Sequence, residues 1–568
     1  MRDLVGKLVT SALEALQEEG VIPSEAALTI QIERPRDKKH GDFSANAAMV
    51  MARHARMNPR KLAQMILDKI PEDSAVERWE IAGPGFLNAT LAGDARAAVI
   101  GKILKERERF GLSTIGGGKR VQVEFVSANP TGPMHVGHGR GAVIGDAIAR
   151  LLAATGHAVE KEYYINDAGV QVGVLGRSVL FRYRALFGDT VTIPEGGYPG
   201  EYVIDVAKAL QERDGDRWLE TARSDQAPPE EVVDFAIATV MAMIRSDLDA
   251  LEIRFDSWFS ERTLHSDGKI AAVLERLAAK DLLYEGVLEP PKGKKTDDWE
   301  QRPQTLFRSS QFGDETDRPL KKSDGAFTYF AADIAYHHDK AERGFERLID
   351  VWGADHGGYI KRVKAALEAL TGRKDILDVS LVQMVNLSRG GTPVRMSKRA
   401  GTFVTLREVV DEVGSDAVRF LFLTRSGNAM LDFDLDLAVS RSNDNPVYYV
   451  QYAHARVCSV QRQMEEKGLS ATVGEDLDRL VEPAENSLIQ LLSKYPEVID
   501  NAALSGEPHR LPYYLLDLAS AFHTYYNGHR VLEEDGALRN ARYSLVEAVR
   551  QVINNGLTVL GVSAPERM

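Results

Sequence analysis

The stretch VQVEFVSANPTGPMHVGHGRGAVIGDAIARLL, residues 121–152, decides how the central part of this chain folds. VQVEFV alternates apolar and polar residues as a strand does, SANPTGPM is broken by proline and glycine, and apolar residues from Val136 onward recur at helical spacing. A strand, a loop and a helix in this order begin a βαβ unit, which predicts a parallel sheet. His135 and His138 would then lie in the first turn of the helix.

The predicted helix start has the chemistry of a phosphate site. Residues three apart share one helix face, and the unpaired amides and positive dipole of a first turn favour an anion. Imidazole donors at His135 and His138 would bind a polyphosphate, while Gly137 would let a base or ribose lie against the backbone. We therefore expect these three residues to bind a nucleotide.

The rest of the chain divides into three parts by its patterns. Residues 1–112 mix helix and strand and predict a separate α+β domain. In 113–425, strands such as AVEKEYYI and RLIDVWGAD alternate with helices, which predicts an α/β, doubly wound parallel sheet with a helix-rich insertion at about 180–300. Residues 426–568 show nearly continuous helical periodicity and predict an all-helical domain.

Composition sets further limits. The only cysteine, Cys458, excludes an internal disulfide and a cysteine-rich zinc site, so we expect a cytoplasmic protein with no bound structural metal. No apolar run approaches the roughly 18 residues of a membrane span, so no membrane association is expected. The net charge of −13 argues against a general polyanion binder but leaves room for local contacts with nucleic acid.

Two other interpretations of the helix start remain. The histidines could be helix caps or surface residues. Alternatively, GRGAVIG at 139–145, followed by Glu160 and Glu162, imitates a dinucleotide-binding fingerprint and would indicate a dehydrogenase. That fit is poor because the loop after the strand is long, the spacing is G-x-G-x-x-x-G, and the histidines would have no role.

A second candidate motif is TPVRMSKRAGTFVTL, residues 392–406. It reads as a basic loop next to a glycine, in which Arg395, Lys398 and Arg399 would close over phosphates and offset charge on a leaving pyrophosphate. Taken alone, the same charge run could be an ordinary solvated loop.

Together the two motifs resemble the HIGH and KMSKS signatures of class I aminoacyl-tRNA synthetases. Arg395 and Arg399 depart from the second signature at both ends, whereas its second lysine is present as Lys398. Some members carry a lysine just before the first motif; here TGP stands at 131–133, which is consistent with Lys398 keeping the catalytic role.

The resemblance to the arginyl-tRNA synthetase family covers nearly the whole chain. HGDFSANAAM and GPGFLNATL resemble its N-terminal appended tRNA-binding domain, EYYINDAG its Rossmann-like catalytic core and GYPGEY its insertion. DNPVYYVQYAHAR and VSAPERM resemble its helical anticodon-binding domain.

The resemblance implies an arginine–tRNA ligase. Such an enzyme activates L-arginine with ATP to arginyl-adenylate and pyrophosphate, then transfers arginine to the 3' end of tRNA(Arg), commonly requiring the tRNA for activation. A monomer using Mg²⁺ is expected. The implied catalytic residues are His135, His138 and Lys398, and the implied ATP-binding residues are His135, Gly137, His138, Asp355, His356, Met396, Ser397 and Lys398.

A guanidinium is planar and permanently charged, so its pocket should offer carboxylates and other acceptors. Strand ends bind ligands in doubly wound sheets, and residues one helical turn apart can face one cavity. By position in matching motifs, the implied arginine site is Glu124, Ser127, Asn129, Tyr329 and Asp333. The implied tRNA contacts are Phe86, Asn88, Tyr448, Tyr452 and Met568, although aromatic residues at helical spacing are more often core.

Other assignments explain less. The synthetases for isoleucine, valine and leucine carry a large editing domain, for which the insertion has little room. The cysteinyl enzyme needs a cysteine-ligated zinc, and small nucleotidylyltransferases lack a helical C-terminal domain and the MSK loop. A catalytically silent tRNA-binding relative is disfavoured by the presence of His135, His138 and Lys398.

Overall fold

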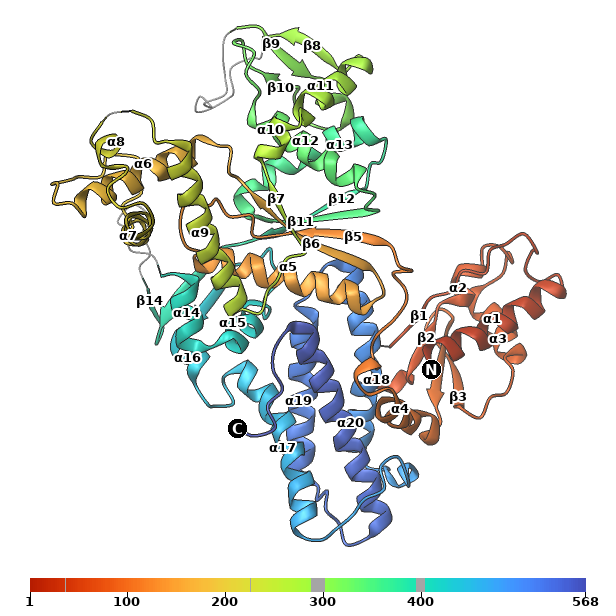
Figure 1. The fold of residues 1–568 in the computed structure, drawn as a ribbon. Coiled ribbons are helices and arrows are strands. Elements are labelled where there is room, and N and C mark those ends of the chain that lie inside the picture. The colour runs from red at the N-terminus through yellow and green to blue at the C-terminus, as the bar shows by residue number, and fades with distance from the viewer. Residues whose placement is uncertain (36, 225, 288–301, 395–403) are drawn as a thin grey trace.

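The computed structural model describes residues 1–568 apart from 36, 225, 288–301 and 395–403. An N-terminal α+β domain, a central α/β domain and a C-terminal helical domain follow one another along the chain (Figure 1). Within the described ranges, no helix has both the length and the apolar character that a bilayer crossing needs.

The N-terminal domain is a four-stranded antiparallel sheet with helices packed on it. The apolar stripe of the first helix, which includes Val5, Val9 and Leu13, is buried against the sheet and its neighbouring helix. The elements are α1 (Arg2–Glu18), β1 (Ile32–Glu33), β2 (Phe43–Ala45), α2 (Ala47–Met51), α3 (Pro59–Lys69), β3 (Val76–Ala82), β4 (Phe86–Leu91) and α4 (Gly93–Glu106), with 3₁₀ turns at Lys38–His40 and Arg107–Arg109.

A five-stranded parallel sheet forms the centre of the molecule, in the order β12-β11-β5-β6-β7. Its strands are β5 (Arg120–Glu124), β6 (Ala158–Ile165), β7 (Ser257–Ser260), β11 (Arg347–Gly353) and β12 (Leu377–Val382). Helix α5 (Val136–Ala154) lies on one face, and α12 (Tyr329–Glu342) and α13 (Ile360–Thr371) lie on the other (Figure 1). The strand order reverses between β5 and β11, and such a switch point is where doubly wound sheets bind ligands.

The alternation in VQVEFV decides which side chains face which layer. Val121, Val123 and Phe125 are buried in the core that contains α5, whereas Glu124 is buried on the α12 side. The helix lies so close to the strand end that a Cβ added at Gly145 would come within 2.2 Å of the Phe125 ring. The small residues of α5 therefore bring its first turn up to the carboxyl end of the sheet.

The segment expected to be a helix-rich insertion, about 180–300, contains helices but also returns to the sheet. Strand β7 pairs in parallel with β6 and forms the edge of the central sheet. Its four residues, SWFS, are too few to show a strand pattern in the sequence. The helices around it are α6 (Val170–Ala185), α7 (Tyr202–Asp214), α8 (Leu219–Arg223), α9 (Glu230–Ala250), α10 (Arg262–Ser266) and α11 (Lys269–Ala279).

Two small sheets complete the central domain. The first is antiparallel and consists of β8 (Leu283–Gly286), β9 (Gln304–Phe307) and β10 (Arg318–Lys321), with a 3₁₀ segment at Ser309–Phe312 between β9 and β10. A further 3₁₀ segment, Ala354–Tyr359, follows β11 of the central sheet. The second consists of β13 (Val385–Arg389), β14 (Thr392–Pro393) and β15 (Leu431–Asp434) and is accompanied by α14 (Leu406–Val413), α15 (Ser415–Phe422) and α16 (Leu435–Val439).

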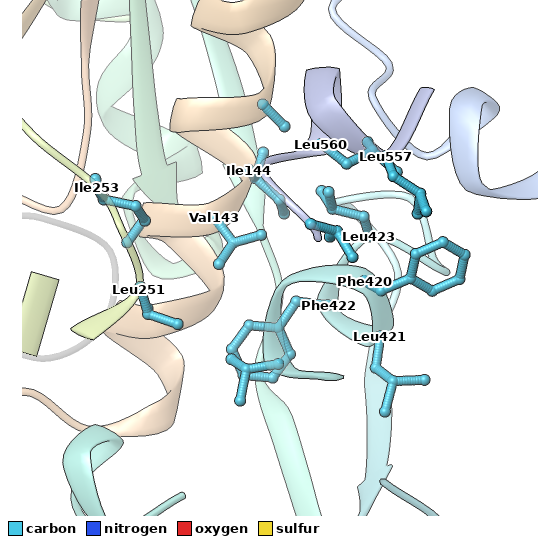
Figure 2. Packing of buried hydrophobic residues seen from close by; sticks show 14 of the residues in the cluster. Val143, Ile144, Leu251, Ile253, Phe420, Leu421, Phe422, Leu423, Leu557 and Leu560 are labelled. Atoms are coloured by element: carbon cyan, nitrogen blue, oxygen red, sulfur yellow. The ribbon is translucent and has the colours of Figure 1, made fainter. Parts of the chain in front are cut away.

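The C-terminal domain consists of long packed helices, as the periodicity predicts. They are α17 (Pro446–Glu466), α18 (Pro483–Ser505), α19 (Arg510–Gly528) and α20 (Gly536–Leu560), with a 3₁₀ turn at Leu477–Arg479. Figure 2 shows the end of α20 packed against the central domain, where Leu557 and Leu560 meet Ile144 of α5 and the residues 420–423 at the end of α15.

A buried arginine holds this junction together. Arg419 of α15 donates to the carbonyl oxygen of Leu560 at 2.9 Å, to that of Leu251 at 2.8 Å and to the Asp146 carboxylate at 2.6 Å. Asp146 lies on α5, so Arg419 links the helix that starts with the histidine motif to the end of α20 in the helical domain.

Candidate active site

The two histidines of the motif form the start of α5. His135 is the N-cap residue, and its Nδ1 accepts the backbone N–H groups of Gly137 at 3.1 Å and His138 at 3.4 Å. The Nδ1 of His138 accepts the N–H of His135 at 3.4 Å. Because both Nδ1 atoms act as acceptors, the N–H of each neutral ring is at Nε2. Each ring thus has its donor on the edge opposite the capping nitrogen, as a phosphate site requires.

Gly137 lies close to the His135 ring, where a side chain would be crowded. A Cβ at this position would lie 3.0 Å from Cε1 and 3.1 Å from Nδ1 of His135. Met134, which precedes His135, is also held in place, because the buried carboxylate of Asp247 on α9 accepts its N–H at 3.4 Å. Burial raises the pKa of Asp247 to about 6.

Three predicted nucleotide-binding residues, Met396, Ser397 and Lys398, lie outside the described residues. The chain on either side of them is well anchored. Val394 donates to the carbonyl oxygen of Leu387 at 2.9 Å, and Leu406 donates to that of Met134 at 2.8 Å. Thr405 pairs with His135 in an isolated bridge, so the second motif leads directly back to the first.

Asp355 and His356 lie just after β11, at the carboxyl end of the sheet. Both side chains are exposed, and the His356 Nε2 atom is 3.6 Å from the Asp355 carboxylate. Their exposure makes them accessible to a ligand at the switch point.

The strand that precedes the histidine motif ends in a strained turn. Val126 and Ser127 have φ values of 70° and 41°, in the left-handed region that β-branched residues rarely adopt. In this turn the Ser127 hydroxyl donates to the Glu124 carboxylate at 2.8 Å. The Ser127 hydroxyl oxygen also accepts the backbone N–H of Tyr164 at 3.2 Å. Glu124 and Ser127, both expected in the arginine site, therefore form one hydrogen-bonded unit.

The other expected arginine ligands are distributed around this strand end. Asn129 is exposed and donates to Gln171 of α6 at 2.8 Å. Tyr329 begins α12 and is 60% exposed, so it stands clear of the core. Asp333, one turn later, is half-buried and accepts a hydrogen bond from the Tyr359 hydroxyl at 2.5 Å. Burial raises the pKa of Asp333.

Two residues of this region carried no signal in the sequence. Tyr359 binds Asp333, and Glu261 is a buried carboxylate that accepts a hydrogen bond from the Tyr164 hydroxyl. Burial raises the pKa of Glu261 to about 7, with a further contribution from the negative charge of Asp333. Within the described residues, neither Asp333 nor Glu261 forms an ion pair with lysine or arginine. The basic group beside Glu261 is the His265 imidazole, whose Nε2 is 4.0 Å away.

The expected tRNA contacts lie in the two outer domains. Phe86 and Asn88 lie on β4, where Phe86 is half-buried and Asn88 is only 4% exposed. Tyr448 and Tyr452 stack on α17 with ring centroids 5.8 Å apart, and the guanidinium of Arg456 lies 5.0 Å from the Tyr452 ring centroid. Met568 is 49% exposed. The structure thus brings Tyr448 and Tyr452 together on α17, and the C-terminal tail that ends in Met568 runs beside the same helix, where Arg462 donates to the carbonyl oxygen of Glu566 at 3.3 Å.

One buried group has the donor set of a metal site: Glu124, His337 and Asp350. However, the ammonium of Lys340 contacts both carboxylates, and His337 bonds to Asp350 at 2.8 Å. A side-chain cation therefore already neutralises this set of carboxylates.

Comparison with known proteins agrees with this geometry. Residues 3–91 match the model of the arginyl-tRNA synthetase N-terminal domain, residues 99–184 the catalytic domain of class I (R) tRNA synthetases, and residues 450–568 the DALR anticodon-binding domain. The parallel sheet with its histidine motif at the switch point is thus a class I aminoacyl-tRNA synthetase domain.

Full-length relatives narrow the assignment. The arginine–tRNA ligase of Magnetococcus marinus is 58% identical over 100% of both chains, and that of Cereibacter sphaeroides is 51% identical over 99% of this chain and 98% of its own. The chain belongs to the arginyl-tRNA synthetase family. The Thermus thermophilus arginyl-tRNA synthetase structure shares the fold, with a TM-score of 0.75 at 24% identity and full coverage of both chains.

Proposed function

We propose that this chain is an arginine–tRNA ligase, which forms arginyl-adenylate from L-arginine and ATP and then charges tRNA(Arg). The observation that carries the proposal is the meeting of two sites at one switch point. The phosphate donors His135 and His138 begin α5, while the carboxylates Glu124, Asp333 and Glu261 gather around the end of the preceding strand and the face of α12.

The first step needs position and charge rather than covalent help. An oxygen of the arginine carboxylate attacks the α-phosphorus of ATP, a P–O bond to the β-phosphate breaks, and pyrophosphate leaves with the negative charge. The Nε2–H groups of His135 and His138, together with Lys398, would stabilise that charge. ATP enters as its Mg²⁺ complex, and Gly137, Asp355, His356, Met396 and Ser397 complete the proposed nucleotide site.

The second step transfers the arginyl group. A ribose hydroxyl of the 3'-terminal adenosine of the tRNA attacks the carbonyl carbon of the adenylate, the bond from that carbon to the phosphate oxygen breaks, and AMP leaves with the hydroxyl proton on a phosphate oxygen. Holding the two reactants in a reactive orientation can supply a large part of the rate of such a step.

Selection of arginine follows from the charge of the pocket. Asp333 and Glu261 have raised pKa values because burial opposes their ionisation. A guanidinium supplies a permanent positive charge and several N–H donors, so it would restore the ionised state of both groups. Glu124, Ser127 and Asn129 at the strand end would then hold the α-ammonium and carboxylate of the amino acid, and Tyr329 would cover the entrance.

Binding of tRNA is assigned to both outer domains. We assign 1–112 to the appended domain, 113–425 to the catalytic domain with its insertion at about 180–300, and 426–568 to the anticodon-binding domain. The first elements after this boundary, β15 and α16, nevertheless pack with β13 and α14 of the catalytic domain. The stacked rings of Tyr448 and Tyr452, together with Met568, would contact unpaired anticodon bases. Phe86 and Asn88 would act at the tRNA elbow. Since Asn88 is buried, its role would be to shape the surface beside Phe86. A cytoplasmic monomer is part of the proposal.

The test is ATP–pyrophosphate exchange in the presence of tRNA(Arg), with arginine as the amino acid. We expect activity in the wild type and a loss of about 10²-fold or more in Lys398→Ala, with an unchanged melting temperature. Lys467→Ala, at the end of α17 and far along the chain from the motif, is the control and should exchange normally. Near-normal exchange by Lys398→Ala would refute the role of that lysine.

A further inference from the structure

Three buried carboxylates form a row across the central sheet. Asp350 of β11 is in register with Glu124 of β5, and Glu124 is in register with Glu162 of β6. In a parallel sheet, residues in register point to the same face. Their exposed fractions are 0%, 6% and 0%, so all three are withdrawn from solvent. Such a row requires compensating cations on the layer that covers it.

One face of α12 supplies those cations. The ammonium of Lys340 contacts Glu124 and lies 2.9 Å from Asp350, while Arg343 binds Glu162 at 2.6 and 2.9 Å. Ion pairs thus hold the helix on the sheet. Lys340 neutralises Asp350 and Glu124, and Glu124 is the carboxylate proposed to bind the amino acid.

Lys340 also determines how the Glu124 carboxylate is turned. One carboxylate oxygen, Oε1, accepts from the Ser127 hydroxyl at 2.8 Å, and the other, Oε2, accepts from Lys340. With both oxygens held, the carboxylate has a single orientation. Lys340 itself is 0% exposed, so its route to a bound amino acid is through Glu124, while its second partner, Asp350, is buried beneath the site.

The same helix carries the carboxylate proposed for the other end of arginine. Asp333 and Lys340 are seven residues apart, which places them two turns apart on one side of α12. An ion pair from Lys340 to Glu124 therefore ties the helix that bears Asp333 to the strand that bears the α-ammonium ligand. The span between these two carboxylates is the length that an amino-acid side chain must match.

We propose that Lys340 is a positioning residue that sets the span of the amino-acid pocket and thereby its selectivity for arginine over cationic amino acids of other lengths. The inference rests on the proposed function. It assigns Lys340 an effect on arginine that a purely structural ion pair would not have.

The experiment compares Lys340→Met with Arg343→Met in the full-length enzyme. The two substitutions remove cations from the same helix face and the same carboxylate row, but only the first touches Glu124. Exchange kinetics are measured with tRNA for arginine and for homoarginine, which is one methylene longer, and the KM for ATP is measured in parallel.

We expect Lys340→Met to raise the KM for arginine about tenfold or more, the effect of one lost charge-assisted contact, and to narrow the preference over homoarginine. The KM for ATP should stay within about twofold of the wild-type value. Arg343→Met should change neither the KM for arginine nor the preference for arginine over homoarginine by more than about threefold. Equal losses in both variants, or an unchanged arginine KM in Lys340→Met, would overturn the inference.

Lys340→Gln provides a second variant, because removing one partner of a buried ion pair can prevent folding. It keeps an N–H donor but not the charge. We expect it too to raise the KM for arginine and to narrow the preference for arginine over homoarginine. If Arg343→Met folds and neither Lys340 variant does, the role of Lys340 is structural and the inference fails. Absence of arginine-dependent exchange in the wild type would instead refute the proposed function.

Discussion

His135 and His138 stack their imidazole rings at the start of α5, with centroids 3.7 Å apart and an angle of 17° between the planes. Each ring accepts a backbone N–H through Nδ1, so the capping of the helix and the placement of the two Nε2 donors are one arrangement. The helix cap and the proposed phosphate site can nevertheless be separated by substitution.

His135→Asn should separate them. Asparagine is a good N-cap residue and can accept the same amide hydrogens, but it has no donor at the position of Nε2. We expect exchange to fall by about 10²-fold while the melting temperature stays near that of the wild type. His135→Ala should lose a similar rate and, in addition, about 1 kcal/mol of stability. A variant His135→Asn with full activity would exclude His135 as a phosphate donor.

Gly137→Ala should act through the His135 ring. The added Cβ would lie 3.0 Å from the imidazole, tighter than most Cβ contacts, so the ring must shift by a few tenths of an ångström. We expect the KM for ATP to rise with little change in the KM for arginine. Gly141→Ala, in the same helix with open space around its Cβ, is the matched control and should be fully active and slightly more stable. Equal kinetics in the two variants would contradict the ring contact.

Arginine binding should depend on pH through Glu261. Burial raises its pKa to about 7 in the protein, and a bound guanidinium favours the ionised carboxylate. The affinity for arginine should therefore weaken as the pH falls below about 7, by up to tenfold per pH unit, while the KM for ATP changes less. In Glu261→Gln we expect weaker binding at about pH 8 and a flatter profile. A profile unchanged by that substitution would show that Glu261 is not the titrating group.

Asp247 should destabilise the protein at neutral and alkaline pH. Its pKa is raised to about 6, above the unfolded value, so the folded protein binds the proton more tightly and stability falls as the pH rises between these two values. A pKa shift of this size lowers the free energy of unfolding by about 3 kcal/mol at pH values above the folded pKa. Asp247→Asn keeps an acceptor for Met134, so its melting temperature should exceed that of the wild type at about pH 8. The difference should shrink as the pH falls to about 5; a constant difference would contradict the account.

The histidine motif and the fold were accessible from the sequence because their signals are local. An alternating strand, a loop broken by proline and glycine, and His135 at a helix start lie within one short stretch, and the structure confirms the parallel doubly wound sheet with a helical C-terminal domain. The edge strand β7 was not predicted as such, because four residues show no periodicity and only tertiary pairing with β6 makes them a strand.

The missed residues depend on contacts between distant segments. Glu261 and Tyr359 become neighbours of Asp333 only after the sheet and α12 have packed. Lys340 did leave a trace, since Asp333, His337 and Lys340 recur at the spacing of one helix face. That spacing does not reveal that three buried carboxylates, in register on adjacent strands, lie opposite this face of α12.

The central claim is tested most directly by charging a purified tRNA pool with each amino acid in turn, using ATP and Mg²⁺ and the wild-type chain. The account predicts that radioactive arginine becomes acid-precipitable on tRNA and that the other amino acids, lysine included, remain at background. Charging with any other amino acid, or binding of tRNA without charging of arginine, would contradict it.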